Sequence, residues 1–412
     1  MNPPVTVANV ESSAVPAVEG RSWIGPVFAC LFILSVVKGI RMPNRWAMTH
    51  YLFTYQTGFM KRALWGELLR RLFGSWTASY FFLAGVGLVV FAALAAIMWR
   101  ACRRVPLTTD TVRFLAVFAA SPALAFLAHL AGYLEHVGYL ALMVALLFRR
   151  HWRLHIVWLL GIAALLPFVH EASIFWVACL TGLAAISGTA KPSQRLLALA
   201  LVAVMWAAST AAVLRFGRVS RLHLEALRAD RVSFAQFLLR PDAFDTLRTT
   251  LAESRVSMQV WWPNPDRQVE FAYSLLVFAP AAFVLGAIAV RRARLLDGGP
   301  VMRATAIALA LGAAAGPLVL HAVALDQHRW NALAAFNVGL AALILLQASP
   351  EAAPPGRSGG LAVALVVAVW SIASHGLFFD DYQPTHPPFS SQIDFLVRAV
   401  RTPDRAIWIP RD

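Results

Sequence analysis

Charged side chains are scarce in this sequence. They make up 14% of its 412 residues, against about 25% in an average soluble protein. Lysine is almost absent, occurring only as Lys38, Lys61 and Lys191. The three cysteines show no paired spacing of the kind that marks a disulfide framework or a metal site. The sequence also contains no phosphate-binding glycine-rich loop and no dinucleotide fingerprint, so an ATP- or NAD-dependent site is not predicted.

Apolar side chains are abundant instead. They account for 59% of the residues, and the mean hydropathy is +0.64. A soluble domain of this size could not bury so much apolar surface and still cover itself with polar groups. This composition excludes a soluble enzyme, a disordered chain and a disulfide-stapled secreted domain. It predicts an all-α, polytopic membrane protein.

A membrane-spanning helix needs about 20 apolar residues. About eleven segments approach that length, near 23–40, 77–99, 111–130, 134–149, 154–169, 172–188, 195–215, 270–290, 303–323, 330–347 and 360–378. We therefore expect a bundle of about eleven spans over residues 22–378. A disordered N-terminal tail (1–21) would precede it, and a C-terminal tail (379–412) would follow.

The net charge of +15 comes almost entirely from arginine. Basic residues concentrate in alternate connections, near 100–104, 149–153, 191–195, 291–294 and 357, whereas the short turns at Glu135-His136 and His170-Glu171 carry no Lys or Arg. This is the pattern of the positive-inside rule, and it explains the basic charge better than nucleic-acid binding does. It predicts a cytoplasmic N-terminus and an external C-terminus.

With this orientation, the unusual polar residues gather on the outer face. The external loop 41–76 contains KRALWGELLRRLF (61–73), which has one apolar and one basic face and predicts a helix lying in the membrane interface. The external loop 216–269 is rich in arginine. There we expect a short helix capped by Ser233 and a second helix from Pro241 to about Arg255.

Three short turns on this face carry ionisable pairs or triplets. His170 and Glu171 follow an apolar run, and two interpretations are equally open: a functional site, or a carboxylate that caps the next helix. Glu135 and His136 lie in a glycine-flanked turn, where a solvated loop pair is the simpler interpretation. The third turn contains Asp326, Gln327, His328 and Arg329. Its Arg329 suits a phosphate group, or forms a local pair with Asp326.

This layout resembles the GT-C-type membrane glycosyltransferases of bacteria. The resemblance rests on the many spans, the amphipathic first external loop and the polar outer face, and locally on GFMKRALWGELL, PFVHE and DQHRW. It implies a bacterial cytoplasmic-membrane enzyme that uses a polyprenyl-phosphate-linked sugar. Such proteins usually carry an acidic catalytic residue in the first external loop. Here residues 41–76 contain no Asp, and Glu67 is their only acid. Either another acid has taken that role or the chain is a non-catalytic relative.

The resulting hypothesis is inverting sugar transfer at the outer interface. The partners would be a lipid-linked sugar donor, a glycan or glycolipid acceptor and membrane lipids, without nucleic acid. Glu171 is the first candidate base, because partial burial would raise its pKa; Asp326 and Glu135 follow. The candidate substrate-binding residues, mainly for the donor phosphate, are Lys61, Arg62, His170, His328 and Arg329. No metal ligands are predicted, and a need for a divalent metal is left open. Two alternatives remain: an O-antigen-type polymerase or ligase, and a transporter or lipid-linked glycan flippase.

Overall fold

A computed structural model describes residues 24–188, 190–324, 326–349 and 359–374 of the chain. Every regular element within these ranges is a helix, which confirms the predicted all-α class. The predicted tails, 1–21 and 379–412, lie outside the described residues. The expected positions of the two termini relative to the membrane therefore stay predictions.

Six helices are long and apolar enough to cross a membrane. They are α4 (Tyr80–Arg103), α8 (Trp152–Val169), α11 (Pro192–Phe216), α15 (Pro265–Arg294), α16 (Gly299–Val319, extended by the 3-10 turn η4, Leu320–Ala322) and α17 (Gln327–Ala348). A seventh candidate consists of α5 (Thr109–Ala119) and α6 (Pro122–His129), which meet at an angle of 43°. Ser121 caps α6 and Pro122 begins it, so the local sequence starts a new helix where hydropathy suggests continuity.

The other predicted spans correspond to shorter helices. Helices α1 (Ile24–Gly39), α7 (Glu135–Leu147) and α18 (Gly359–Ser374) have 13 to 16 residues. The predicted span at 172–188 is divided into α9 (Ser173–Trp176) and α10 (Ala178–Ile186). The structure thus supports a multi-pass membrane protein with six or seven full-length spans, and the count of eleven stays a prediction.

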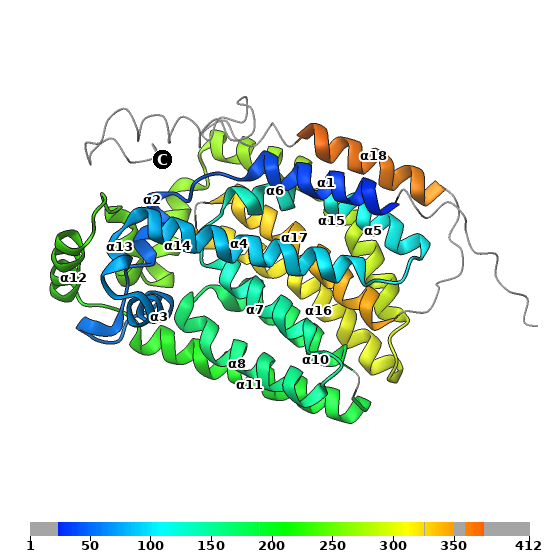
Figure 1. Cartoon of the computed structure of the whole chain (residues 1–412), viewed down its shortest axis with the longest axis horizontal. Coiled ribbons are helices and arrows are strands. Elements are labelled where there is room, and N and C mark those ends of the chain that lie inside the picture. Colours follow the sequence, from blue (N-terminus) through cyan, green and yellow to red (C-terminus); the bar gives the residue numbers. More distant parts are fainter. Residues whose placement is uncertain (1–23, 189, 325, 350–358, 375–412) are drawn as a thin grey trace, which may run out of the picture.

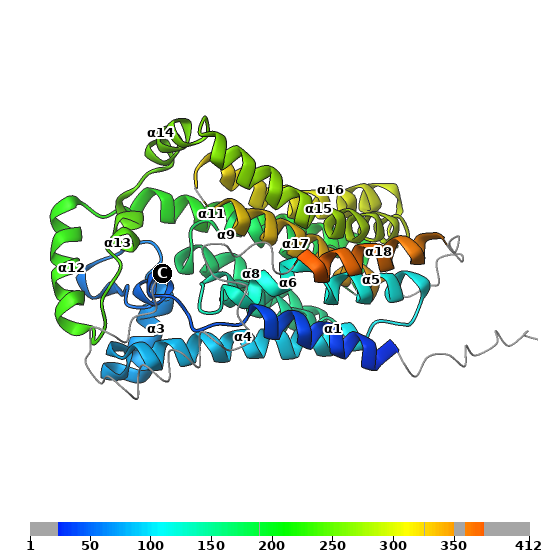
Figure 2. The same cartoon turned by 90° about the horizontal axis from the view of Figure 1, so that it is seen from above.

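Helix α17 forms the centre of the bundle. It packs against α15, α16, α6 and α10, and 89% of its apolar window is buried. Figures 1 and 2 show it beside α15 and α16 in both views. Small residues allow the close approach, because a Cβ atom on Gly339 would lie 2.5 Å from the Phe118 ring. An apolar helix buried on all sides is the expected core of such a bundle.

The two ends of the bundle differ in character. At one end, Arg292 of α15 is 1% exposed and donates to Asp110 of α5, to the Thr108 hydroxyl and to the Ser349 carbonyl, at 2.9–3.0 Å. These contacts tie α5, α15 and the end of α17 together. Helices α2 (Arg45–His50), α3 (Leu64–Phe73), α12 (Arg221–Phe234) and α13 (Pro241–Arg248) lie at the opposite end (Figure 1). Basic residues predicted to set orientation therefore also hold helices together.

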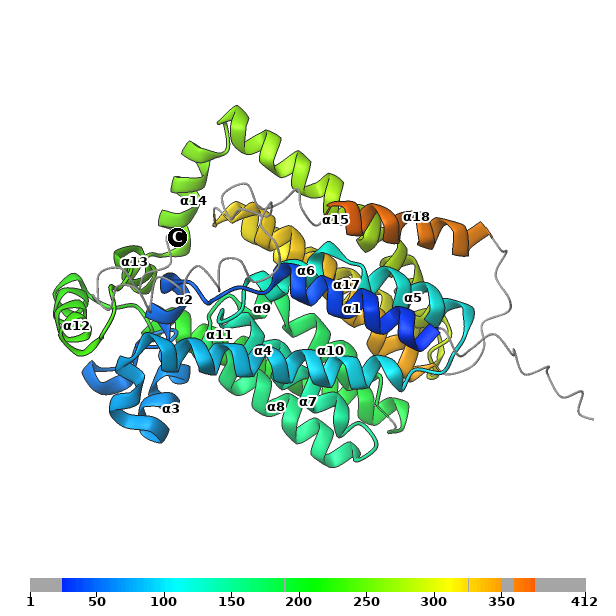
Figure 3. The same ribbon diagram turned by 45° about the horizontal axis from the view of Figure 1, so that its top comes forward.

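The loops 41–76 and 216–269 contain several further helices. The helix predicted within 61–73 is present as α3 (Leu64–Phe73), followed by the 3-10 turn η3 (Gly74–Ala78), and its position in the membrane interface stays a prediction. The prediction that a short helix begins at Ser233 is wrong, because α12 spans Arg221–Phe234 and therefore ends one residue after Ser233. The helix predicted from Pro241 begins as expected but breaks at residues 249–250 into α13 (Pro241–Arg248) and α14 (Leu251–Trp261), since Thr250 and Glu253 form a new capping box. Figure 3 shows α14 standing apart from the bundle.

Candidate functional site

A cap with its own apolar core covers one end of the bundle. It consists of residues 45–63, including α2 (Arg45–His50) and the 3-10 turn η2 (Tyr55–Thr57), together with residues 219–248. Its core is formed by Phe53, Met60, Ala63, Val219, Leu224, Leu227, Ala243, Phe244 and Leu247. The Arg240 amide joins the two segments by donating to the Thr49 hydroxyl at 3.1 Å, and the Lys61 amide donates to the carbonyl of Gly217, just before the second segment, at 3.0 Å. The cap holds Lys61 and Arg62 against the membrane helices.

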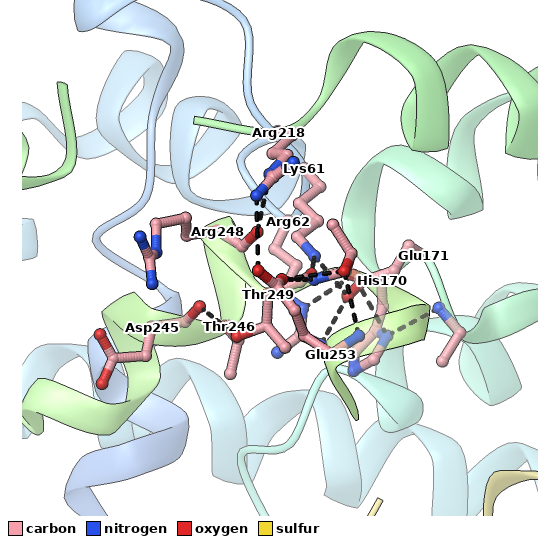
Figure 4. A network of polar contacts seen from close by, with 12 residues as sticks. Lys61, Arg62, His170, Glu171, Arg218, Asp245, Thr246, Arg248, Thr249 and Glu253 are labelled. Atoms are coloured by element: carbon pink, nitrogen blue, oxygen red, sulfur yellow. Dashed lines mark hydrogen bonds and ion pairs between the residues drawn. The ribbon is translucent and has the colours of Figure 1, made fainter. Parts of the chain in front are cut away.

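Arg62 and Glu171 form the centre of the first polar cluster (Figure 4). The Arg62 guanidinium donates through Nε and Nη2 to the two carboxylate oxygens, at 2.7 and 2.6 Å. The Lys61 ammonium lies 3.6 Å from the same carboxylate and donates to the Thr249 carbonyl at 3.0 Å. All three charged side chains are 11–13% exposed. This is a charge-assisted, two-pronged pair, which has both strength and a fixed geometry.

The backbone at Arg62 is unusual. Its φ is +62°, in the left-handed region that residues other than glycine rarely adopt. Such backbone strain persists only where surrounding structure enforces it, and it is concentrated at functional sites. Here the cap core on either side, at Met60 and Ala63, fixes the conformation. The guanidinium is thereby aimed at Glu171 before any ligand arrives.

The pKa of Glu171 is shifted in the direction opposite to the sequence-based prediction. Burial alone would raise the pKa of this carboxyl, but Arg62 and Lys61 outweigh it and hold the pKa well below its ordinary value. Burial lowers the pKa of Lys61, and Glu171 partly offsets that effect. Partial burial was expected to make Glu171 a stronger base, and that expectation is wrong. While Arg62 holds it, Glu171 is an ionised carboxylate and a weak proton acceptor.

Two buried histidines adjoin this pair. His50 uses Nδ1 to donate to the Trp46 carbonyl at 2.8 Å, so its Nε2 is free to accept from Arg62 Nη1 at 3.0 Å. His170 Nδ1 accepts from the Ala172 amide at 3.2 Å, which leaves the proton on Nε2. Burial, with Arg62 second, lowers the pKa of His50 well below its usual range and that of His170 to about 3. Both imidazoles are therefore neutral at neutral pH.

Arg329 and Glu135 form a second buried cluster. The guanidinium of Arg329, at the start of α17, donates to one oxygen of Glu135, at the start of α7. Among the described residues, the other oxygen of Glu135 has no hydrogen-bond partner, although Glu135 is fully buried. The guanidinium also lies over the ring of Tyr133, 4.6 Å from its centroid. A buried carboxylate with an uncommitted oxygen is costly unless a ligand or water supplies a donor.

Asp326 belongs to this second cluster. Its carboxylate caps α17 by accepting from the Arg329 amide at 3.3 Å, and it lies 3.7 Å from the Arg329 guanidinium. Desolvation by surrounding protein raises the pKa of Asp326 to about 6. The side chain nevertheless keeps 43% of its surface exposed. Asp326 is therefore both accessible and a stronger base than an ordinary aspartate.

A narrow pocket, packed too tightly in this structure to admit a water molecule, lies between the two clusters and would have to widen to receive a ligand. It is lined by Trp46, Ala47, His50, Tyr133, Leu134, Glu135, His170 and Arg329. The rings of Trp46 and Tyr133 stack with their centroids 5.4 Å apart. His50 and His170 form the boundary with the Arg62–Glu171 pair, and Glu135 and Arg329 belong to the other cluster. One pocket therefore joins side chains from the 41–76 loop and from the α6–α7, α8–α9 and α16–α17 connections.

The structure brings together most of the residues predicted from the sequence. Lys61, Arg62, His170 and Glu171 form one cluster, and Glu135, Asp326 and Arg329 form the other. The predicted ligand His328 lies on the first turn of α17 but does not line the pocket. Sequence reasoning missed His50, Trp46 and Tyr133. The only local signal for His50 was an ionisable side chain within a short, largely apolar segment.

Within the described ranges, no three His, Cys, Asp or Glu side chains group as a metal site requires. The acids are engaged with arginines instead. Comparisons of the chain with protein-family models, with curated proteins and with solved structures found no match. What the site does must therefore be argued from its own geometry.

Proposed function

We propose that this protein is an integral membrane glycosyltransferase. In this proposal it takes a sugar from a polyprenyl-phosphate donor and transfers it to a glycan or glycolipid of the bacterial cell envelope. The observation that carries the proposal is the pocket. Its lining contains one cation, Arg329, one carboxylate, Glu135, and the stacked rings of Trp46 and Tyr133, and the Lys61–Arg62–Glu171 cluster adjoins it at one end of an apolar helical bundle. A lipid-linked phosphosugar presents the complementary groups: a phosphate, hydroxyls and an apolar tail.

The cations have the chemistry needed for a departing phosphate. Lys61 and Arg62 lie on one side of the histidines, and Arg329 lines the pocket on the other. Guanidinium groups hold phosphate oxygens in a two-pronged geometry, and positioned cations stabilise the charge that develops on a leaving group. The neutral Nε2–H of His170 supplies a further donor beside the pocket. No nucleotide is required, because the lipid phosphate is itself the leaving group.

Glu135 is better placed as the general base than Glu171, because an arginine holds only one of its two oxygens, whereas Arg62 holds both oxygens of Glu171. An acceptor hydroxyl attacks the anomeric carbon from the face opposite the phosphate, and its proton passes to the uncommitted oxygen of Glu135. The bond between that carbon and the phosphate oxygen breaks, and polyprenyl phosphate departs as an anion held by the cations. General-base assistance of this kind contributes about 10²–10⁴-fold. Asp326, with its raised pKa, is the second candidate.

The distribution of basic residues supports placing the pocket on the external face. Arg100 and Arg103 end α4, and Arg291, Arg292 and Arg294 end α15, at the end of the bundle away from the cap. Short connections rich in arginine favour the cytoplasm. In the proposed orientation the chain begins in the cytoplasm, ends outside it, and presents the cap and pocket to the periplasm.

A transfer assay with the purified protein in lipid nanodiscs tests the proposal. The donor is a radiolabelled polyprenyl-phosphate monosaccharide, and the variants are Glu135→Gln and Asp326→Asn. We expect Glu135→Gln to lower the rate at least about 100-fold. The control Glu225→Gln changes a carboxylate that is 60% exposed and pairs with Arg221 on α12. Unchanged transfer by Glu135→Gln would remove Glu135 as the base. Transfer only from a lipid-diphosphate oligosaccharide would instead identify a polymerase or ligase.

A further inference from the structure

Glu171 occupies the position in which Arg62 would hold a ligand's anionic group. Its two oxygens accept from Nε and Nη2 of one guanidinium at 2.7 and 2.6 Å. Arginine presents the same pair of donors to a phosphate, whose oxygens match this fork as well as those of a carboxylate do. The carboxylate therefore fills a phosphate-shaped site with a side chain of the protein itself.

This filled site adjoins the pocket directly. His50 lines the pocket and accepts from Arg62 Nη1, and His170 lines it with Nδ1 3.8 Å from Glu171. Arg62, Lys61 and Glu171 each keep 11–13% of their side-chain surface exposed. The pair is therefore shielded, yet a ligand in the pocket would meet it after passing only two imidazoles.

The cations around Glu171 have more capacity than one carboxylate uses. Lys61 and Arg62 share this carboxylate, and Lys61 lies at 3.6 Å, beyond hydrogen-bond reach. The Lys61 ammonium donates to the Thr249 carbonyl at 3.0 Å, and Arg218 adds positive charge nearby. A phosphate carries more charge and more acceptor oxygens than a carboxylate. It could therefore engage Arg62 and Lys61 together.

Glu171 also lies outside regular secondary structure. It lies between the end of α8 at Val169 and the start of α9 at Ser173, in a turn outside both helices. The residue before it, His170, has extended backbone angles (φ −157°, ψ 116°). Arg62, by contrast, is fixed by the cap core around it. Displacement would therefore shift the acid and leave the guanidinium in place.

We propose that Glu171 is an internal stand-in for the phosphate group of the ligand, and that ligand binding displaces it from Arg62 and Lys61. This inference rests on the proposed function and deepens it: the pair Lys61–Arg62 is the phosphate site, and Glu171 keeps it closed until a phosphate arrives. A buried cation without a partner is strongly destabilising, so the stand-in stabilises the empty protein. It also lowers ligand affinity, because the ligand must first compete with it.

Direct binding measurements separate this role from a purely structural ion pair. The probe is inorganic phosphate, titrated calorimetrically into the purified full-length protein in nanodiscs. We expect Glu171→Gln to bind phosphate at least about tenfold more tightly than the unaltered protein, because the competing charge is gone. We expect Arg62→Gln to lose phosphate binding. Arg62→Lys keeps the positive charge but lacks the two parallel N–H donors of the guanidinium, so this variant should bind phosphate more weakly than the unaltered protein.

The matched control is Glu67→Gln. Glu67 is held by Arg70 and Arg71 at 2.8 and 2.6 Å, and its side chain is 7% exposed, but it lies on α3 and does not line the pocket. Phosphate affinity should not change in this variant. Equal or weaker phosphate binding by folded Glu171→Gln would overturn the proposal. If that variant does not fold, Glu171→Asp, which shortens the carboxylate's reach, must show tighter binding, and unchanged affinity would overturn the proposal equally.

A second titration identifies the source of the phosphate group. A short-chain prenyl phosphate that binds more tightly than inorganic phosphate supports a lipid-linked ligand, and equal affinities support a soluble phosphate ester. If neither probe binds to the protein or to Glu171→Gln, the stand-in does not exist. Tighter phosphate binding by Glu171→Gln without any sugar transfer would retain this inference and reject the proposed transferase. The two failures are therefore distinguishable.

Discussion

Arg329 and Glu135 pair across 194 positions of sequence, and the pair joins the start of α17 to the start of α7. Both side chains are buried, at 6% and 0% exposure. The contact places the central helix of the bundle against the turn that carries Tyr133 and Glu135. Two of the residues that line the pocket are thus fixed by each other, and the aromatic ring of Tyr133 lies against the same guanidinium.

Removing Arg329 alone should destabilise the protein strongly. Arg329→Met leaves Glu135 buried without its cation, which costs about 3–5 kcal/mol. Adding Glu135→Gln to this variant removes the stranded charge and should recover a large part of the loss. Thermal unfolding of the single and double variants in detergent, followed by tryptophan fluorescence, measures both effects.

An exposed ion pair provides the comparison. Arg221 and Glu225 on α12 lie 3.0 Å apart, with side chains 81% and 60% exposed. Arg221→Met should change stability by less than about 1 kcal/mol, because solvent screens the pair. If the double variant at positions 135 and 329 is no more stable than Arg329→Met, burial of an uncompensated charge is not the cause of the loss.

Asp326 should make stability fall as pH rises through its titration range. Its folded pKa, about 6, lies above the ordinary value of 3.8. The folded protein therefore binds this proton more tightly than the unfolded chain. The contribution is complete below about pH 4 and is lost as the pH passes about 6. Because the side chain is 43% exposed, we expect an effect below about 1 kcal/mol.

Asp326→Asn isolates the charge. Asparagine retains the oxygen that accepts from the Arg329 amide, so the helix cap is kept. As the pH rises from 4 to 7, the melting temperature of this variant should increase relative to that of the unaltered protein. A constant difference between the two melting curves over this range would show that the carboxyl titrates at its ordinary pKa.

His170, unlike Asp326, should make the stability of the protein fall as the pH decreases. Burial lowers its pKa to about 3, so the unfolded chain binds this proton more readily than the folded protein. Its contribution to stability is complete above about pH 6.5 and is lost as the pH falls toward about 3. His170→Gln should therefore lose less stability than the unaltered protein between pH 6.5 and pH 4.5.

His151→Gln is the control for this series. His151 is exposed and lies between α7 and α8, at the end of the bundle away from the cap. Melting temperatures across the pH series, measured in one detergent, give the comparison. A steeper acid loss in His170→Gln than in the unaltered protein would show that His170 is charged in the folded state.

The apolar pattern predicts the fold class well but the span count poorly. Hydropathy identifies apolar segments, and each of the eleven predicted segments contains at least one helix. It cannot detect a bend, because Ser121 and Pro122 leave the run apolar while they start a new helix. It cannot separate a span from a short buried helix either. The four-residue α9 and nine-residue α10 are surrounded by protein, where apolar composition serves packing rather than membrane crossing.

The candidate site, too, could be predicted from the sequence only in part. Ionisable residues at the ends of apolar helices are recognisable because burying them is costly, and this pointed to Glu135, Glu171 and Arg329. The residues that pair with these side chains in the fold could not be recognised from the sequence. The sign of the pKa shift at Glu171 depends on Arg62, which is 109 positions away and reaches it only because the cap folds over the bundle. His50 carries no sequence signal that distinguishes it from a packed core histidine.

Cysteine labelling tests which face of the membrane carries the cap. Glu225→Cys places a thiol on α12 within the cap, at a side chain that is 60% exposed. Arg150→Cys places one at an exposed position between α7 and α8, at the opposite end. In intact cells a membrane-impermeant maleimide should label Glu225→Cys, whereas Arg150→Cys should react only after the membrane is permeabilised. The protein with its native Cys30, Cys102 and Cys179 gives the background. Labelling of Arg150→Cys alone in intact cells would place the pocket in the cytoplasm. A polyprenyl-phosphate sugar displayed on the outer surface could not reach it there, and the proposed transfer would fail with the orientation.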